Sequence, residues 1–235
     1  MNQEKKFTIQ NYDLNNTSKE EYTDYYKKYE SDSPSESRNS MAKKIRELIQ
    51  NNMILPKKIL NIGSGVLTLE KELMYSHIQK KDRSKILKEY DFVSIDLAKI
   101  SSIKLFDKKR KDFLHTQANA IELPFKNKTF GLVVSNHAID FAPHEPSFKE
   151  AFRVLNNNSN AIFYFHHPSL LEQSDGKDRS VMILWKYLKE NSMLFENENE
   201  IKNSLKNAGF SSISVNLNSN KSKSSLWWEV VAKKI

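Results

Sequence analysis

The sequence contains no cysteine, little glycine and no long hydrophobic run. Among its 235 residues there are five glycines and six prolines. Without cysteine the protein cannot form a disulfide, use a thiolate nucleophile or bind zinc through sulfur. No apolar run approaches the ~20 residues that a helix needs to cross a bilayer, and the first residues lack the apolar stretch of a signal peptide. We therefore expect a cytoplasmic protein that does not enter a membrane.

The composition is that of a globular domain with an excess of positive charge. Hydrophobic residues make up 38% and charged residues 28%, and a chain of this length can bury one full core. The net charge of +8 permits an anionic partner such as RNA. The lysines are scattered, however, and the two densest runs, residues 80–85 and 104–111, fall between expected strands, where charge usually faces solvent. RNA binding is therefore kept as an alternative.

The apolar pattern divides the chain into an N-terminal extension, residues 1–40, and a larger domain, residues 41–235. The extension contains tyrosines at i, i+3, i+4 and i+7 spacing, which share one helix face: Tyr22, Tyr25, Tyr26 and Tyr29. This helix is either a lid over a ligand or an element that packs on the sheet edge. A polar loop separates it from a helix that begins near Glu36.

From residue 57 onward, expected strands and helices alternate. Strands are expected at 58–62, 91–96, 113–118, 130–135, 161–165, 212–217 and 226–231. Helices are expected at 67–78, 148–155, 180–195 and 198–208. Alternation indicates a parallel sheet, and the last two strands, with no helix between them, indicate an antiparallel edge. We predict a doubly wound α/β fold: a mostly parallel, seven-stranded sheet with helices on both faces and an antiparallel C-terminal edge.

A glycine turn, Gly63-Ser64-Gly65, lies between the first strand and the helix that follows it. Glycine lets the backbone approach a ligand closely, and a helix N-terminus offers free amide groups. The second strand ends in Asp96, whose carboxylate can accept hydrogen bonds from both hydroxyls of a ribose. These features favour a nucleotide site, although Asp96 could instead be a strand-end turn residue.

Two further segments extend this pattern. Leu123-Pro124-Phe125 precedes the fourth strand, and residues 150–155 read Glu-Ala-Phe-Arg-Val-Leu. Together with the glycine turn and Asp96 they resemble the class I S-adenosylmethionine-dependent methyltransferases, most closely the branch that acts on small molecules. The resemblance runs from about residue 57 to the C-terminus. It implies a Rossmann-like methyltransferase fold with S-adenosylmethionine as the cofactor.

The resemblance also implies which residues contact the cofactor. They lie after the first four strands: Asn61, Gly63, Ser64, Gly65, Asp96, Leu97, Asn119, Ala120 and Asn136. The glycine turn would face the methionine part, the end of the second strand the ribose, and the residues after the third strand the adenine edge. Asn136 would begin the loop that faces the substrate.

The chain departs from the family pattern at several positions. An acidic residue is usual where Asn61 stands, a third glycine where Leu67 stands, and an acid where Asn119 stands. The usual Pro-Gly-Gly turn is replaced by the asparagine-rich segment 156–160, which we expect to form a turn. Losing two carboxylates weakens the attraction for the cofactor's ammonium and sulfonium groups. A degenerate, non-catalytic methyltransferase-like partner protein is therefore a further alternative.

Candidate catalytic residues follow the fourth and fifth strands. Methyl transfer from a sulfonium depends mainly on proximity and orientation, and a base is needed only where the acceptor loses a proton. His137, Asp140 and His166 are the candidates for this work. We expect no metal site, because His166 and His167 point to opposite faces of a strand and carboxylates at ligand spacing are lacking.

These observations lead to a prediction of function. We expect a methyltransferase that transfers a methyl group from S-adenosylmethionine to a small-molecule acceptor. The alternatives are an RNA-modifying methyltransferase that uses the basic surface and the non-catalytic partner protein. The sequence indicates neither the identity of the acceptor nor the oligomeric state.

Overall fold

A computed structural model describes residues 35–65, 67–75, 86, 88–97, 113–169, 188–221 and 226–235. The tyrosine-rich helix expected near the N-terminus, both basic runs and the first half (180–187) of the helix expected at 180–195 lie outside these residues. Within the described segments, none of the helices combines the length and the apolar character that crossing a membrane requires.

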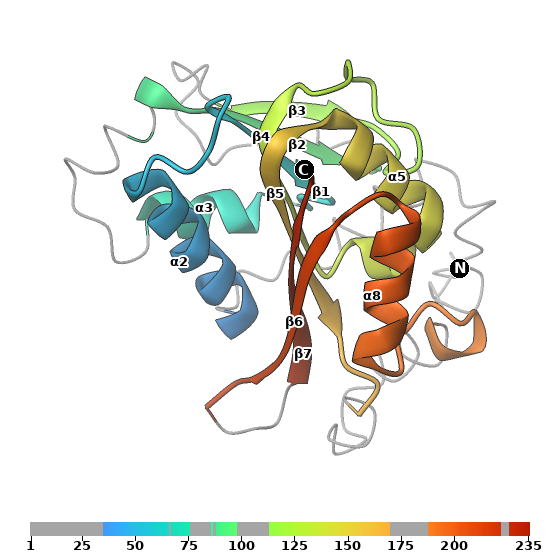
Figure 1. Ribbon diagram of the computed structural model, residues 1–235. Helices are drawn as coiled ribbons and strands as arrows, with labels where there is room; N and C mark the ends of the chain where they lie inside the picture. Colours follow the sequence, from blue (N-terminus) through green and yellow to red (C-terminus); the bar gives the residue numbers. More distant parts are fainter. Residues whose placement is uncertain are drawn as a thin grey trace, which may run out of the picture.

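A seven-stranded sheet forms the centre of the protein (Figure 1). Its strands are β1 (Lys58–Ile62), β2 (Asp91–Asp96), β3 (Phe113–Gln117), β4 (Phe130–Asn136), β5 (Leu155–His166), β6 (Ser212–Ser219) and β7 (Leu226–Lys233). Their order is β3-β2-β1-β4-β5-β7-β6. The first five strands are parallel, whereas β7 pairs antiparallel with both β5 and β6. The predicted fold is confirmed.

Helices cover both faces of the sheet. Figure 1 shows α2 (Glu36–Gln50) and α3 (Thr68–Tyr75) on one side, and α5 (His144–Val154) and α8 (Glu198–Asn207) on the other. Successive residues of one strand face opposite layers, as strand geometry requires: Leu60 packs on the α5–α8 side and Ile59 on the α2–α3 side. The central strand β4 is therefore buried on both faces from Phe130 to Ser135.

The helix α2 is fixed to the sheet by its ends and by its apolar face. The Ser35 side chain caps the helix by accepting a hydrogen bond from the Arg38 amide. Lys44 forms an ion pair with Glu229 of β7, which also accepts a 2.8 Å hydrogen bond from the Tyr164 hydroxyl. Burial, the largest effect, raises the pKa of Tyr164.

The expected division of the chain between residues 40 and 41 falls inside α2, which is continuous from Glu36 to Gln50.

The asparagine-rich segment after α5 is the main departure from the expected fold. The asparagines there were expected to supply a left-handed turn; Asn158 does adopt a left-handed conformation, but the segment belongs to β5, which begins at Leu155 directly after the helix. The pairing with β4 shifts between Phe130 and Leu132, so the additional residues of β5 form an irregularity in the ladder. Asn158 lies there with φ of 58°, a conformation that asparagine tolerates better than most residues.

Gly131 in β4 packs closely against the backbone of Leu55 and Pro56, the segment that precedes β1. A Cβ atom at this position would lie 2.1 Å from the Pro56 carbonyl oxygen and 2.7 Å from the Leu55 carbonyl carbon. Because both are backbone atoms, Gly131→Ala should lower the free energy of unfolding by about 1–3 kcal/mol. Denaturant titration measures this, with Ser212→Ala on the exposed edge strand as the control. Equal stability of the two variants would contradict the proposed close approach.

Candidate active site

The candidate site lies where the parallel strands end. In this sheet the strand order reverses between β1 and β4, so the loops after these two strands leave toward opposite faces. Open α/β sheets bind ligands at such a switch point, outside the carboxyl ends of the strands. Every residue proposed for cofactor or substrate belongs to a loop or strand end at this edge.

The glycine turn after β1 is held against the end of β2. The amides of Gly63 and Ser64 both donate to the Ile95 carbonyl, at 2.8 and 2.9 Å. The Gly65 amide donates to Asp96 Oδ2 at 2.8 Å. Both glycines have positive φ, 72° and 50°, so the turn uses their conformational freedom. The turn and the carboxylate expected to act together are in direct contact.

Leu67 occupies the position where a third glycine was expected. Its φ is 60°, the left-handed region in which glycine avoids the steric cost that a side chain incurs. The leucine is fully buried, and its amide donates to the Ser64 carbonyl at 2.9 Å. The chain therefore keeps the backbone conformation of the turn with a non-glycine residue, at a cost of about 1–2 kcal/mol.

A buried carboxyl group that the sequence analysis missed lies beside Asn61. Glu70 of α3 is 2% exposed, and its Oε1 accepts a hydrogen bond from Asn61 Nδ2 at 2.7 Å and one from the Ser94 hydroxyl. Burial raises the pKa of Glu70, while the bonds from Ser94 and Asn61 act in the opposite direction. The sequence feature that could have identified Glu70 is its place as the acidic residue in the first turn of the helix after the glycine turn. Position 61, where the family usually has an acid, is therefore occupied by an asparagine that contacts a glutamate of α3.

The residues expected at the adenine edge follow β2 and β3. The Leu97 carbonyl accepts a 2.8 Å hydrogen bond from the Gln117 side chain, which fixes the end of β2 against β3. Asn119 is exposed, and its Oδ1 accepts from the Ile121 amide at 3.2 Å. Ala120 packs partly against the core. The Asn119 oxygen therefore shapes its own turn, and its second lone pair is the one available to a ligand.

The two segments that carried the family resemblance form one structural unit. Arg153 of α5 donates to the Leu123 carbonyl at 2.9 Å and to the Phe125 carbonyl at 2.7 Å. Glu150 accepts from the Leu123 amide at 2.7 Å and pairs with Arg153. The hydrogen bond from Arg153 is the largest cause that lowers the pKa of Glu150. This pair therefore holds the loop before β4 in place.

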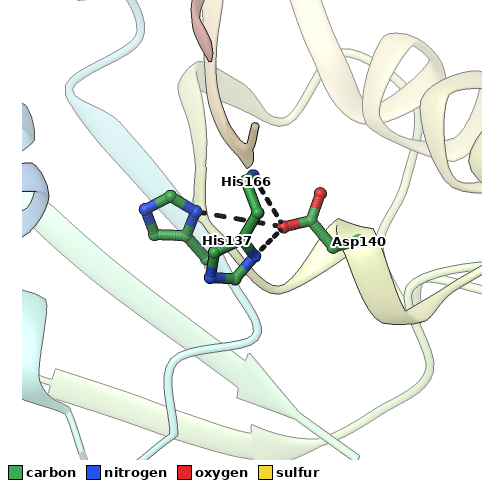
Figure 2. Close-up of side chains that lie close together, drawn as sticks. All are labelled: His137, Asp140 and His166. Atoms are coloured by element: carbon green, nitrogen blue, oxygen red, sulfur yellow. Dashed lines mark hydrogen bonds and ion pairs between the residues drawn. The ribbon is translucent and has the colours of Figure 1, made fainter. Parts of the chain in front are cut away.

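The catalytic candidates lie together at the ends of β4 and β5 (Figure 2). Asp140 Oδ2 is 2.6 Å from His166 Nδ1 and accepts from the His166 amide at 3.1 Å. His137 Nδ1 lies 3.9 Å from the same oxygen, and the two imidazole rings are 4.1 Å apart. Burial, followed by the charges of His166 and Arg38, holds the pKa of His137 well below its usual value. We call His137, Asp140 and His166 the acceptor-side cluster.

Backbone geometry brings the acceptor-side cluster together. His137 follows Asn136 at the end of β4 with φ of 59°, and its amide donates to the Tyr164 carbonyl of β5. Asp140 lies in a short 3-10 helix, η2 (Ile139–Phe141), and is 1% exposed. The expectation that no carboxylate lies at ligand spacing is wrong, because donor atoms of His137, Asp140 and His166 all lie within 4.8 Å of one another.

Two other histidines from the same loops lie outside the cluster. The His144 ring stacks on Phe195 at 4.2 Å, on the α5–α8 side of the sheet. His167 Nδ1 is 2.7 Å from the Ser169 hydroxyl, and its ring contacts Trp228. Their roles in packing and in a local turn separate them from the three candidate residues.

Comparisons with known proteins agree with this geometry. Residues 75–163 match the sequence model of a methyltransferase domain. No curated protein matches the chain in sequence. A S-adenosylmethionine-dependent methyltransferase from Aquifex aeolicus has a similar structure, with a TM-score of 0.60 and 13% identity over 89% of this chain and 97% of the other.

Two further similar structures are methyltransferases with bound ligands. One is the 1,6-didemethyltoxoflavin-N1-methyltransferase of Burkholderia thailandensis, solved with 1,6-didemethyltoxoflavin and S-adenosylhomocysteine (TM-score 0.60, 12% identity, 91% of this chain and 85% of that one). The other is phosphoethanolamine N-methyltransferase 2 of Haemonchus contortus, solved with phosphomonomethylethanolamine and S-adenosylhomocysteine (TM-score 0.56, 13% identity, 81% and 52%). The resemblance to class I S-adenosylmethionine-dependent methyltransferases is therefore confirmed in the fold and in the methyltransferase-domain segment.

The raised pKa of Glu70 predicts how stability depends on pH. Below the usual value of 4.5 the carboxyl group is protonated in both the folded and the unfolded chain. As the pH rises through 4.5 the unfolded chain releases its proton first, so the wild type loses stability until the pH passes the raised folded pKa. Glu70→Gln removes this loss. The stability of the variant relative to the wild type should therefore increase as the pH rises above 4.5, until the raised pKa of the folded chain is passed.

Chemical denaturation at a series of pH values measures the effect. Glu122→Gln, at an exposed glutamate, is the matched control. Parallel stability curves for Glu70→Gln and the wild type would show that burial does not raise the pKa of this carboxyl group.

Proposed function

We propose that the protein binds S-adenosylmethionine at the glycine turn and transfers its methyl group to a small-molecule acceptor. The observation that carries this proposal is the hydrogen bond from the Gly65 amide to Asp96 Oδ2, because it places a backbone turn and a buried carboxylate at one edge of the sheet. The carboxylate is thereby oriented to accept hydrogen bonds from a ribose through its remaining lone pairs.

The residues at this edge fit the cofactor. Ser64 Oγ and Asn136 Oδ1 are buried polar atoms, and within the described part of the chain neither has a hydrogen-bond partner. In our proposal these two atoms face the methionine part together with the glycine turn, Leu97 and Ala120 contact the adenine, and Asn119 binds its edge. When bound, S-adenosylmethionine supplies a methyl group on a positively charged sulfur.

Glu70 bears on whether the site is degenerate. A non-catalytic protein was considered because Asn61 and Asn119 stand where carboxylates are usual. Glu70 contacts Asn61 directly and lies close enough to Asp96 for the two carboxyl groups to interact. A carboxyl group therefore contacts the residue that stands where the family usually has an acid, which supports the proposal that this edge is still a binding site.

The choice of a small-molecule acceptor rests on the comparisons and on the acceptor-side cluster. Two of the similar structures hold small molecules beside S-adenosylhomocysteine, 1,6-didemethyltoxoflavin in one and phosphomonomethylethanolamine in the other. The RNA alternative requires the basic runs at 80–85 and 104–111 to converge on the site, and both lie outside the described residues. The cytoplasmic location stays a prediction.

The acceptor-side cluster is suited to an acceptor that loses a proton from oxygen or nitrogen. In our proposal Asp140 accepts a hydrogen bond from His166 Nδ1–H and thereby fixes the orientation of the ring. His166 then takes the proton from the acceptor through Nε2 while the methyl group is transferred. His137 packs against the His166 ring and limits its rotation. Asp140 is a positioning residue in this arrangement.

Cofactor binding is tested by substituting the carboxylate at the end of β2. Asp96→Ala should weaken S-adenosylmethionine and S-adenosylhomocysteine binding by about 1–3 kcal/mol, or roughly 5- to 150-fold in Kd, because charge-assisted hydrogen bonds to the ribose are lost. Calorimetry measures the affinity, and Asp91→Ala, at the exposed other end of β2, is the control. Unchanged affinity would show that Asp96 is only a turn residue. Failure of the wild type to bind either compound at millimolar concentration would overturn the proposed function.

The role of Asp140 is tested by kinetics once an acceptor is found by screening metabolite extracts with labelled cofactor. Asp140→Asn should lower kcat by at least about tenfold, because a general base contributes roughly 10²–10⁴-fold and the His166 ring loses its orienting partner. The KM for S-adenosylmethionine should change little, since Asp140 lies on the acceptor side. His144→Gln, at a histidine outside the cluster, is the control. A change in KM for the cofactor with kcat intact would argue against the proposed role.

A further inference from the structure

The acceptor-side cluster contains more donor atoms than its hydrogen bonds use. Asp140 Oδ2 accepts from the amide of His166 and lies beside its ring nitrogen. Asp140 Oδ1 and His137 Nδ1 are also buried, and neither finds a hydrogen-bond partner among the described residues. Unpaired buried polar atoms are costly, and those in native proteins commonly face a water or an ion.

The distances in the cluster distinguish a hydrogen-bonded triad from a set of ligands. In a triad, His137 would donate to Asp140, but the 3.9 Å between His137 Nδ1 and Asp140 Oδ2 is too long for a hydrogen bond. Metal bonds to imidazole nitrogen and carboxylate oxygen are about 2.0–2.2 Å, which separates two ligands of a tetrahedral ion by about 3.4 Å. The distance of 3.9 Å between His137 Nδ1 and Asp140 Oδ2 is close to this separation. His166 Nδ1 lies 2.6 Å from Asp140 Oδ2, so these two atoms would have to move apart by less than about 1 Å to bind the same ion.

The backbone holds the three donors in place without help from an ion. His137 is fixed at the end of β4 by its amide bond to the Tyr164 carbonyl. His166 is the last residue of β5, and its own amide binds the Asp140 carboxylate. Three adjacent elements, β4, η2 and β5, therefore present one ligand each to a common point (Figure 2). Such preorganisation favours binding because little conformational freedom is lost.

We propose that His137, Asp140 and His166 form a binding site for a divalent transition-metal ion. Two imidazoles and one carboxylate suit zinc, iron or cobalt rather than magnesium, which prefers oxygen ligands. Three protein ligands leave a position open for water or for an oxygen or nitrogen atom of the acceptor. The site goes beyond the proposed function, because the ion needs no S-adenosylmethionine to bind.

Metal binding and the hydrogen bond from His166 to Asp140 exclude each other. His166 Nδ1 either carries the proton that it donates to Asp140 or offers its lone pair to the ion. With the ion bound, the acceptor's hydroxyl or amine coordinates at the open position, and the positive charge lowers its pKa. The ion then replaces His166 as the group that makes loss of the acceptor's proton favourable, and that proton passes to solvent water rather than to His166.

Titration of the metal-free full-length chain with cobalt chloride tests the site. The wild type should bind one equivalent per chain, with visible absorption bands of Co²⁺ that zinc chloride abolishes by displacement. His137→Ala, Asp140→Asn and His166→Ala should each weaken binding by at least about 100-fold, because losing a ligand costs more than losing an outer partner, which costs 10–100-fold. His167→Gln, next to the cluster but outside it, should bind as the wild type does.

Thermal unfolding with zinc and with a chelator gives a second readout. Zinc should raise the Tm of the wild type and of His167→Gln, because an ion that binds only the folded state stabilises it, and should leave the cluster variants unchanged. Should one cluster variant fail to fold, the other two decide the matter. Absence of cobalt bands in the wild type, or wild-type affinity in a folded His137→Ala, would overturn the metal site. Calorimetry with S-adenosylmethionine is a separate measurement, so failure of the metal site is distinguishable from failure of the proposed function.

Discussion

The contact between the loop after β1 and the loop after β4 joins the two halves of the candidate site. Gly63 packs so closely on Ala138 that a Cβ atom at position 63 would lie 2.0 Å from the Ala138 side chain. Ala138 stands between His137 and the short helix that carries Asp140. The glycine turn expected to hold the cofactor therefore rests directly on the segment expected to handle the acceptor. Because methyl transfer depends on alignment of donor and acceptor, this backbone contact constrains every other feature of the site.

Fixed polar pairs on both sides of this contact maintain its geometry. On the cofactor side, the Gly65 amide is held by Asp96, and Glu70 binds Asn61 beneath the turn. On the far side of β4, Arg153 and Glu150 hold the loop that contains Leu123 through five hydrogen bonds, two within the pair and three to the loop backbone. Buried or half-buried pairs of this kind have well-defined geometry, because leaving either partner unpaired is costly. The strand ends are therefore held rigidly where ligands would bind.

The sequence predicted features that depend on local patterns and missed features that depend on tertiary contacts. Alternating apolar strands gave the sheet and its antiparallel edge correctly, because burial on both faces leaves a continuous apolar run. The segment around Asn158 was expected to turn, but pairing with β4 extends β5 through it, with the irregularity absorbed in the ladder. Glu70 was overlooked because its partner Asn61 lies nine positions away, across a strand, a turn and a helix. The convergence of Asp140 with the two histidines likewise requires three separate elements to meet.

The chemistry of the acceptor-side cluster follows from the burial of Asp140. A carboxylate that is 1% exposed requires positively polarised partners. Here the backbone amide and the Nδ1 atom of His166 both contact the same oxygen of Asp140, Oδ2. The Nδ1–H group of His166 and a metal ion are two possible partners for this oxygen. With the first, His166 Nε2 takes the acceptor's proton; with the second, the ion lowers the pKa of the acceptor. The neutral state of His137, which its depressed pKa favours, suits both packing against the His166 ring and coordination to an ion. The occupant of this position, a proton or a metal ion, therefore determines which group activates the acceptor.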